Sequence, residues 1–215
     1  PDKYRFGTVG TPVLGLEVKI GGDGEIMLKG RGVMRGYHNL PKETAQTITD
    51  GWLHTGDIGV LEDGFLRITD RKKEIIVNSG GKNISPQNVE SLIKSKCGLV
   101  SDVVVYGDKQ PYLIALITID ESVALHWGET NNRGHQSYNE LISAPSLKAT
   151  IWSDITATNA TLAPHECVRK IAILPKEFTQ ESLELTPTQK VKRRTIFQHN
   201  RELISDLYSD TIEAL

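Results

Sequence analysis

Residues 70–86, DRKKEIIVNSGGKNISP, separate two parts of the sequence that differ in texture. The segment opens with an acidic residue and the three consecutive cations Arg71–Lys73, and a short apolar run follows. Near its end, Ser85 predicts a helix cap, because the next residue is a proline that suits the first helical position. We therefore expect a domain boundary here, which divides residues 1–71 from residues 72–215.

Upstream of this boundary the sequence is rich in short β-forming runs. These runs alternate with turn signals such as GGDG at 21–24 and EDG at 62–64. The spacing predicts a small barrel-like or meandering sheet, interrupted by a short helical segment at 41–49. Strands are expected at 16–20, 25–29, 58–61 and 65–69.

Downstream of the boundary, helical and β-branched segments are mixed, which predicts an α+β fold. The helix after Ser85 has apolar residues at helical spacing up to Cys97, and Gly98 ends it. Two neighbouring β-branched runs predict two strands of one small sheet, and a third run follows later. The expected elements are helices at 86–97, 145–162 and 194–208, strands at 100–106, 112–119 and 168–174, and a polar loop at 129–136.

Composition and charge exclude several classes of protein. The 215 residues include 38% apolar and 24% charged side chains, which is ordinary for a soluble globular protein and excludes collagen-like, coiled-coil and disordered chains. The net charge of -2 gives no overall electrostatic footprint for nucleic acid. No apolar stretch approaches the ~20 residues of a membrane helix, and no signal peptide is recognisable. We expect a cytoplasmic protein, and the sequence leaves peripheral membrane attachment of the full-length form open.

Generic catalytic and metal-binding motifs are missing from the sequence. It has no P-loop, no nucleophile elbow and no metalloprotease helix, and its six histidines are scattered, so we expect no metal site. Cys97 and Cys167 lack metal-ligand or redox spacing and are expected to be buried, reduced packing residues.

The run Thr55-Gly56-Asp57 is the first of three segments with chemical potential. A carboxylate that follows glycine on a tight turn can approach a ligand closely and accept two hydrogen bonds from vicinal hydroxyls. Ribose offers such a pair of hydroxyls. The alternative is a plain turn before the strand at 58–61.

The other two segments are basic. The cations Arg71–Lys73 could clamp an anion between two domains or form an ordinary solvated face, and Gly80–Gly81 behind them indicates a hairpin turn. Residues 186–194, TPTQKVKRR, place four cations in five positions. Without interleaved aromatic residues this loop gives only weak support for nucleic-acid binding, which we do not expect.

Taken in order and spacing, these segments resemble the adenylate-forming (acyl-activating) enzyme superfamily, which includes acyl-CoA synthetases, luciferases and peptide-synthetase adenylation domains. WLHTGD at 52–57 is similar to the family's W-x-x-T-G-D motif, and Asp70-Arg71 is similar to its D-R junction. TPTQK at 186–190 resembles the late T-x-x-G-K loop, with Gln189 in place of the usual glycine. The G-E-[LI]…G…V…G-Y…P…T signature is resembled by Gly24-Glu25-Ile26, Gly30, Val33, Gly36-Tyr37, Pro41 and Thr44.

The resemblance extends from about residue 7 to 194, and two stretches point to a subgroup. RKKEIIVNSGGKN at 71–83 and TPTQKVKR at 186–193 look like the long-chain fatty acyl-CoA synthetase branch. The resemblance implies that residues 1–71 are the β-rich end of a large N-terminal AMP-binding domain. Residues 72–215 are then the small mobile α+β C-terminal domain.

The chemistry implied by the resemblance is a two-step ligation. A fatty acid carboxylate attacks the α-phosphate of ATP to give acyl-adenylate and pyrophosphate, and the thiol of CoA then displaces AMP. The family's phosphate loop, its glutamate for Mg²⁺ and its acyl pocket have no counterpart in this sequence. Because the sequence also begins without Met, we expect these parts upstream of Pro1, and we expect the chain alone to be inactive.

The resemblance also assigns roles to individual residues. It makes Asp57 the acceptor of the ribose hydroxyls and Arg71 a second nucleotide contact. Lys190 becomes the catalytic lysine, which bridges the acyl carboxylate and the α-phosphate and so also binds the nucleotide. Lys73 falls at the hinge of the mobile domain, and the CoA-channel loop comprises Ser79, Gly80 and Gly81.

Two other interpretations stay open on the sequence. The chain could be a stand-alone regulatory module that binds nucleotide or CoA. It could also belong to an acyl-AMP ligase that delivers the acyl group to the phosphopantetheine arm of a carrier protein.

Overall fold

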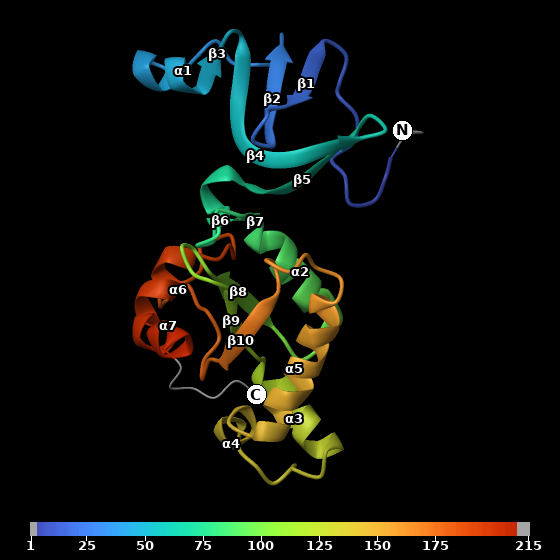
Figure 1. The fold of residues 1–215 in the computed structure, drawn as a ribbon, viewed down its shortest axis with the longest axis vertical. Helices are drawn as coiled ribbons and strands as arrows, with labels where there is room; N and C mark the ends of the chain where they lie inside the picture. The colour runs from blue at the N-terminus through green and yellow to red at the C-terminus, as the bar shows by residue number, and fades with distance from the viewer. Residues whose placement is uncertain (1–3, 210–215) are drawn as a thin grey trace. The chain divides into compact units, whose positions relative to one another are not determined.

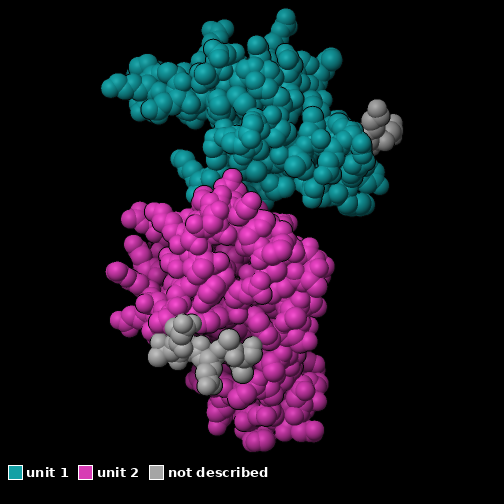
Figure 2. All heavy atoms as spheres, viewed as in Figure 1, with its two compact units in different colours: residues 1–75 teal, residues 76–215 magenta. Residues whose placement is uncertain are grey.

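The chain divides into two compact units. The computed structural model describes residues 4–209. Figure 2 shows the two units, which are residues 1–75 (unit 1) and residues 76–215 (unit 2). The division falls between Ile75 and Ile76, whereas the sequence predicts a boundary between residues 71 and 72.

Unit 1 is built around one antiparallel sheet. Its strands are β1 (Leu16–Ile20), β2 (Glu25–Gly30), β3 (Ile48–Thr49), β4 (Trp52–Glu62) and β5 (Phe65–Arg71). They follow the order β1-β2-β4-β3, and β5 also pairs with β4, which curves through the whole unit (Figure 1). The meandering sheet predicted from the sequence is therefore confirmed. A short helix, α1 (Pro41–Thr47), precedes β3, and a 3-10 helix, η1 (Lys72–Glu74), follows β5.

Local turn chemistry explains why these strands pair with their sequence neighbours. Asp63 and Gly64 join β4 to β5, and both have positive φ values of 51° and 80°, as a two-residue hairpin turn requires. Between β1 and β2, the side chain of Asp23 accepts a hydrogen bond of 3.1 Å from the backbone N–H of Glu25. Gly24 there has a φ of 84°. The turns therefore set the register of the sheet.

Unit 1 buries very little apolar surface. Among its described residues, Ile26 is the one buried apolar side chain. Large apolar side chains are instead exposed on this unit, including Phe6 at 92% and Val13 at 69%. The sheet of unit 1 therefore lacks a closed apolar core of its own. Burial of apolar surface is the main favourable term in folding, so this unit gains little of that stabilisation by itself.

Unit 2 contains a three-stranded mixed sheet. Its strands are β8 (Asp102–Tyr106), β9 (Leu113–Thr118) and β10 (Val168–Ile173). The order is β10-β9-β8, with β8 antiparallel and β10 parallel to β9. The prediction of two neighbouring strands and a later third strand is confirmed. The parallel crossover carries α3 (Glu121–Thr130), α4 (Tyr138–Ile142) and α5 (Pro145–Asn159).

Helices cover both faces of this sheet, so every residue of β9 is buried. Leu113, Ala115 and Ile117 belong to one core, together with residues of α2 (Pro86–Lys96) and α5. Ile114 and Leu116 point the other way, into a second core with α6 (Arg193–His199) and α7 (Arg201–Tyr208). Figure 1 shows the sheet between these two pairs of helices.

Helix α2 begins as the sequence predicts. The side-chain oxygen of Ser85 accepts a hydrogen bond of 3.2 Å from the N–H of Asn88, and Pro86 occupies the first turn. Before it, β6 (Ile76–Val77) and β7 (Asn83–Ile84) form a small antiparallel hairpin. The hairpin turn predicted at the double glycine is therefore confirmed.

The helical predictions differ from the structure in several places. Helices α3 and α4 were not expected; Asp120 caps α3 by accepting from the N–H of Val123 at 3.1 Å. The single closing helix predicted at 194–208 is two helices, α6 and α7, because Asn200 leaves helical geometry with a φ of -108° and a ψ of 24°. The helix predicted at 145–162 ends at Asn159.

The two cysteines differ in how deeply they are buried. Cys97 is 1% exposed, and burial raises the pKa of its thiol to about 11. Cys167 is only half-buried, so the expectation of full burial is wrong for this residue; its thiol faces the carbonyl oxygens of Asn159 and Ala163.

Within residues 4–209, no helix has both the length and the apolar character that crossing a membrane requires.

Candidate functional site

Asp57 lies in a β-bulge inside β4, so the expectation of a tight turn before a strand at 58–61 is wrong. In the pairing of β4 with β2, Ile58 is opposite Glu25 and His54 is opposite Met27. The three residues between Ile58 and His54 therefore face a single residue of β2, and Gly56 adopts a φ of 72° to allow this. The bulge bends the strand and re-aims the side chain of Asp57.

Thr55 holds the bulge in place. Its hydroxyl donates to the carbonyl oxygen of Ile26 at 2.7 Å. The same hydroxyl accepts from the backbone N–H of Asp57 at 3.1 Å. The backbone of the predicted ribose-binding carboxylate is thus fixed by its own T-G-D motif.

The structure brings Asp57 and Arg71 together. They are partners across the β4–β5 ladder, and Nε of Arg71 lies 2.8 Å from Oδ1 of Asp57 as an ion pair. The carboxylate side chain is 20% exposed and the guanidinium side chain 62% exposed. A carboxylate can accept hydrogen bonds from hydroxyls, and a neighbouring guanidinium can donate to phosphate or ribose oxygens, so the pair has the chemistry that nucleotide recognition needs.

A buried carboxylate that the site prediction missed lies behind this pair. Glu25 is 3% exposed and accepts from the backbone N–H of Gly56 at 2.9 Å and from Nζ of Lys72 at 3.0 Å. Because an ionised carboxylate only accepts, Nδ1 of His54 donates to it at 2.8 Å. Burial alone raises the pKa of Glu25, but these hydrogen bonds outweigh burial and hold its pKa below the ordinary value. The glutamate of the G-E signature was the available signal in the sequence.

Lys73, the predicted hinge, is exposed in η1, close to the division between the two units. Its neighbour Lys72 is held instead, with Nζ 2.7 Å from Oδ2 of Asp23 and 3.0 Å from Oε2 of Glu25. Hydrogen bonds to Asp23 and Glu25 raise the pKa of Lys72, so it stays charged. The chain is therefore anchored to unit 1 up to the residue before the predicted hinge.

The predicted CoA-channel loop is the turn between β6 and β7. The side chain of Asn78 closes it by accepting from the N–H groups of Gly80 at 3.0 Å and Lys82 at 2.9 Å. Gly81 has a φ of 71°, and a Cβ added there would have no atom within 4 Å. Ser79 donates its backbone N–H to the carbonyl of Gln110 at 3.0 Å. The glycines therefore make an open, exposed backbone that a thin chain could pass.

Lys190 lies on a second tight turn of unit 2. Leu185 and Val191 form an antiparallel bridge, and the N–H of Thr186 donates to the carbonyl of Lys190 at 2.8 Å. The N–H of Lys190 in turn donates to the hydroxyl of Thr186 at 2.9 Å. Gln189 has a φ of 60°, which explains why glycine is favoured at this position and shows that the turn forms without it. The side chain of Lys190 is exposed.

Behind this turn lies a second carboxylate that the sequence did not reveal. Glu90 on α2 is 8% exposed and pairs with Arg193 at the start of α6 through two contacts, one of which, Nη2 to Oε2, is 2.6 Å. Glu90 also accepts from the N–H of Val105 at 2.8 Å. The pair joins the Lys190 turn to the helix that follows the glycine loop.

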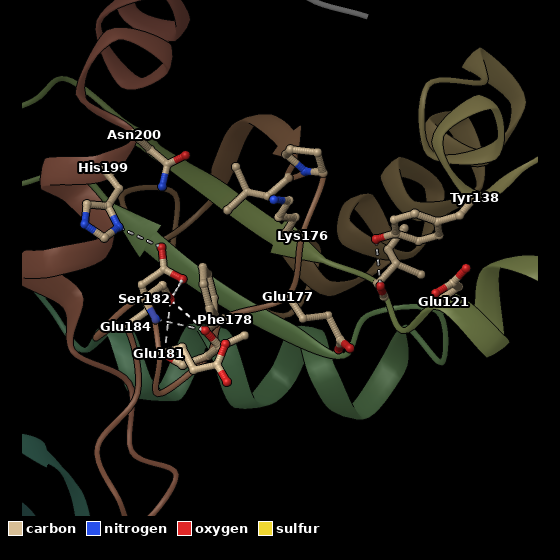
Figure 3. A pocket seen from close by; sticks show the side chains of 14 residues that line it. Glu121, Tyr138, Lys176, Glu177, Phe178, Glu181, Ser182, Glu184, His199 and Asn200 are labelled. Atoms are coloured by element: carbon tan, nitrogen blue, oxygen red, sulfur yellow. Dashed lines mark hydrogen bonds and ion pairs between the residues drawn. The ribbon is translucent and has the colours of Figure 1, made fainter.

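Unit 2 also has a pocket of about 670 Å³, lined by both polar and apolar side chains (Figure 3). On one wall, Glu184 accepts from Ser182 at 2.6 Å and lies 3.1 Å from Nδ1 of His199. On the other wall, the hydroxyl of Tyr138 donates to the carbonyl of Ile119. None of the predicted site residues lines this pocket. Over residues 4–209, no three His, Cys, Asp or Glu side chains are grouped as a metal site would need.

Comparisons with known proteins agree with these motifs. The family model described as "AMP-binding enzyme C-terminal domain" matches residues 73–212. The long-chain-fatty-acid–CoA ligase FadD15 of Mycobacterium tuberculosis is 41% identical over 95% of this chain and 34% of its own length. The mouse long-chain-fatty-acid–CoA ligase ACSBG1 is 32% identical over 98% of this chain and 32% of its own length. The chain therefore spans about a third of the length of these curated relatives.

Solved structures show the same fold. The adenylation domain of a carboxylate reductase from Mycobacterium chelonae has a TM-score of 0.72 at 23% identity, over 93% of this chain and 32% of that one. The O-succinylbenzoate coenzyme A synthetase of Bacillus subtilis, in complex with AMP, has a TM-score of 0.62 at 26% identity, over 88% of this chain and 35% of that one. The resemblance to adenylate-forming enzymes and the expected α+β fold are thus confirmed. The chain belongs to the AMP-binding enzyme family, and residues 73–212 match that family's C-terminal domain.

Proposed function

We propose that this chain is part of an AMP-forming long-chain fatty acid–CoA ligase. The full-length enzyme activates the fatty acid with ATP as an acyl-adenylate and transfers the acyl group to CoA. The observation that carries the proposal is the pairing of Asp57 with Arg71 across β4 and β5, in a chain that is 41% identical to a long-chain-fatty-acid–CoA ligase.

In this proposal unit 1 supplies the contacts to the nucleoside. The bulge at Gly56 aims the carboxylate of Asp57 away from the regular ladder, where two vicinal hydroxyls of ribose can donate to it. Arg71 then exchanges part of its ion pair with Asp57 for contacts to the nucleotide. Both residues bind and orient ATP rather than take part in bond making.

Unit 2 supplies one loop for each half-reaction. Lys190, exposed on its turn, lies between the acyl carboxylate and the α-phosphate, where a cation offsets the repulsion of two anions as they meet. Rotation about Lys73 then replaces this turn with the glycine loop at Ser79, Gly80 and Gly81, past which the pantetheine arm of CoA reaches the acyl-adenylate. Domain rotation therefore assigns one loop to each step.

Mg²⁺ would assist ATP in such a reaction, but the described residues do not fit a metal site. Among residues 4–209, no group of three or more His, Cys, Asp or Glu side chains lies close enough together to hold a metal ion. We therefore derive no step through a metal from this chain. We propose that the ligands of Mg²⁺ belong to another part of the full-length enzyme.

Unit 1 also supports the proposal that the enzyme is longer than this chain. Among the described residues, this unit buries one apolar side chain and exposes many, including Phe6, Val13 and Leu14 in the segment before β1. We propose that further segments of the N-terminal domain cover this surface. The isolated chain is accordingly expected to form no acyl-adenylate.

The test uses the full-length protein that contains this chain. Palmitate-dependent exchange of pyrophosphate into ATP measures the first step, and acyl-CoA formation measures the second. The proposal requires both activities. Exchange without transfer to CoA, but with transfer to a phosphopantetheinylated carrier protein, would favour the carrier-dependent ligase. Absence of exchange with fatty acids of every length, despite AMP binding, would favour a binding module.

A further inference from the structure

Glu25 is a buried ionised side chain that the proposed mechanism does not use. Its side chain is 5% exposed, and its carboxylate has three partners, two on β4 and one on η1. Oε1 accepts from the N–H of Gly56, and Oε2 accepts from His54 and Lys72. A buried charge is costly unless it is paired and hydrogen-bonded, so a residue retained for packing alone would be apolar.

The first partner leads directly to the nucleotide site. Gly56 precedes Asp57, and its N–H would face inward without an acceptor if Glu25 were removed, because the bulge has withdrawn it from the ladder. The hydrogen bond of 2.9 Å therefore fixes the peptide that aims Asp57. Glu25 therefore acts on Asp57 through the Gly56 peptide.

The second partner leads to the hinge. Lys72 lies between Arg71, which pairs with Asp57, and Lys73, the proposed point of rotation. Oε2 of Glu25 holds Nζ of Lys72 at 3.0 Å, and the more exposed Asp23 provides a second contact at 2.7 Å. Lys72, the last anchored residue before the hinge, and Gly56, in the bulge that carries Asp57, therefore bind the same carboxylate.

We propose that Glu25 is a positioning residue that couples nucleotide binding to the anchored end of the hinge. Its carboxylate holds the Gly56 peptide and the Lys72 ammonium in one rigid arrangement. The ribose contact of Asp57 and the start of the hinge then cannot shift independently. This inference rests on the proposed function, because it takes Asp57 to bind nucleotide and Lys73 to be the hinge.

The test combines two variants in the full-length protein. Glu25→Gln keeps the shape and an acceptor but removes the charge, and we expect it to raise the Kd for AMP and the KM for ATP about tenfold, with kcat changed less than about threefold. Lys72→Gln is expected to raise both about threefold, although Lys72 does not contact Asp57. The double variant is expected to be no weaker than Glu25→Gln alone, since both changes break the same coupling.

Glu62→Gln is the matched control. Glu62 lies in the same sheet and pairs with Arg67 at 3.0 Å, but its side chain is 57% exposed. We expect this variant to leave AMP binding within about twofold of the unmodified protein, as exposed ion pairs contribute little.

Three results would overturn the inference. Glu25→Gln could lower kcat and the melting temperature while KM and Kd stay unchanged, which is the signature of a structural role. The effects of Glu25→Gln and Lys72→Gln could add independently, which would exclude coupling. Lys72→Gln could leave AMP binding unaltered. Calorimetric binding of AMP needs no fatty acid, so an unmodified protein that binds AMP without adenylating fatty acids contradicts the proposed function instead.

Discussion

Arg193 and Glu90 form a two-contact ion pair between residues 103 positions apart in the sequence. Arg193 follows the Lys190 turn at the start of α6, and Glu90 lies on α2, which follows the glycine loop. Their side chains are 17% and 11% exposed. The ion pair therefore connects the two helices that follow the glycine loop and the Lys190 turn, the two loops that the proposed mechanism uses in succession.

Removing one partner of this pair is expected to be strongly destabilising. Arg193→Met leaves Glu90 as a buried charge without its cation, which costs about 3 kcal/mol or more. The double variant Arg193→Met with Glu90→Leu removes both charges and should recover part of that loss. Urea unfolding of unit 2, followed by circular dichroism, measures both. Equal stability of the single and double variants would contradict a buried ion pair.

Gln189 should respond to substitution according to its left-handed backbone. Gln189→Gly relieves the cost of a φ of 60° but adds freedom to the unfolded chain, so stability should change by less than about 1 kcal/mol. Gln189→Val places a β-branched residue in the same conformation and should destabilise the turn by about 1–2 kcal/mol. Denaturation midpoints give the order. A valine variant as stable as the glycine variant would mean that the turn has another conformation.

Lys190→Ala should separate the two half-reactions of the full-length enzyme. We expect acyl-adenylate formation to fall on the order of a hundredfold, since a cation is lost where two anions meet. Thioester formation from supplied acyl-adenylate should be nearly unchanged. Lys192→Ala, two residues along, is the matched control for loss of a cation. Equal loss in both half-reactions would show that Lys190 does not have the proposed role.

Lys73→Pro should have the opposite effect. Proline fixes φ near -65°, a value within the 3-10 range of η1, so it opposes rotation about this residue. Adenylation should persist, while thioester formation slows about tenfold. Lys73→Ala removes the side chain without restricting the backbone and should leave both steps close to normal. If the alanine variant slows thioester formation as much as the proline variant does, the side chain rather than rotation is responsible.

The Glu25 cluster predicts how stability depends on pH. The pKa of Glu25 lies below its ordinary value of 4.5, so its contribution is present above pH 4.5 and is lost as pH falls through the folded-state pKa. The pKa of Lys72 lies above its ordinary value of 10.5, so its contribution is present below pH 10.5 and is lost at higher pH. Unfolding free energies of the unmodified protein and of Glu25→Gln should therefore differ most between about pH 6 and pH 9 and converge in acid. A difference that grows below pH 4.5 would reverse the predicted sign.

The parts of the fold that the sequence predicts are those with local signals. Helix α2 is set by Ser85 and Pro86 at its start, and β9 is recognisable because both of its faces are apolar. Helix α3 was missed because its apolar residues Val123–Leu125 are consecutive rather than spaced at a helical period, and because its cap, Asp120, directly follows a strand region. The break at Asn200 was missed because the apolar spacing continues through it.

In the candidate site, too, the residues with a local sequence signal were predicted and those without one were missed. Asp57, Arg71 and Lys190 were found because motifs mark them, and the pairing of Asp57 with Arg71 follows from the β4–β5 hairpin. Glu25 and Glu90 acquire their roles from partners far along the chain, such as Gly56 and Arg193. No periodicity records such a pairing, and an acidic residue at the start of a strand or on a helix is ordinarily solvated. The bulge at Gly56 was likewise invisible, because a glycine in a strand and a glycine in a turn have the same sequence signal.

The position of β9 between an earlier and a much later strand has a consequence for synthesis of the chain. The β8–β9 hairpin is complete at Thr118, but the parallel partner β10 begins only at Val168. Until the ribosome has released that segment, β9 presents an unpaired edge strand that is apolar up to its last residue, Thr118. We expect the nascent hairpin to be the stage most open to chaperone binding, and docking of β10 to be the late, non-local step that completes the sheet of unit 2.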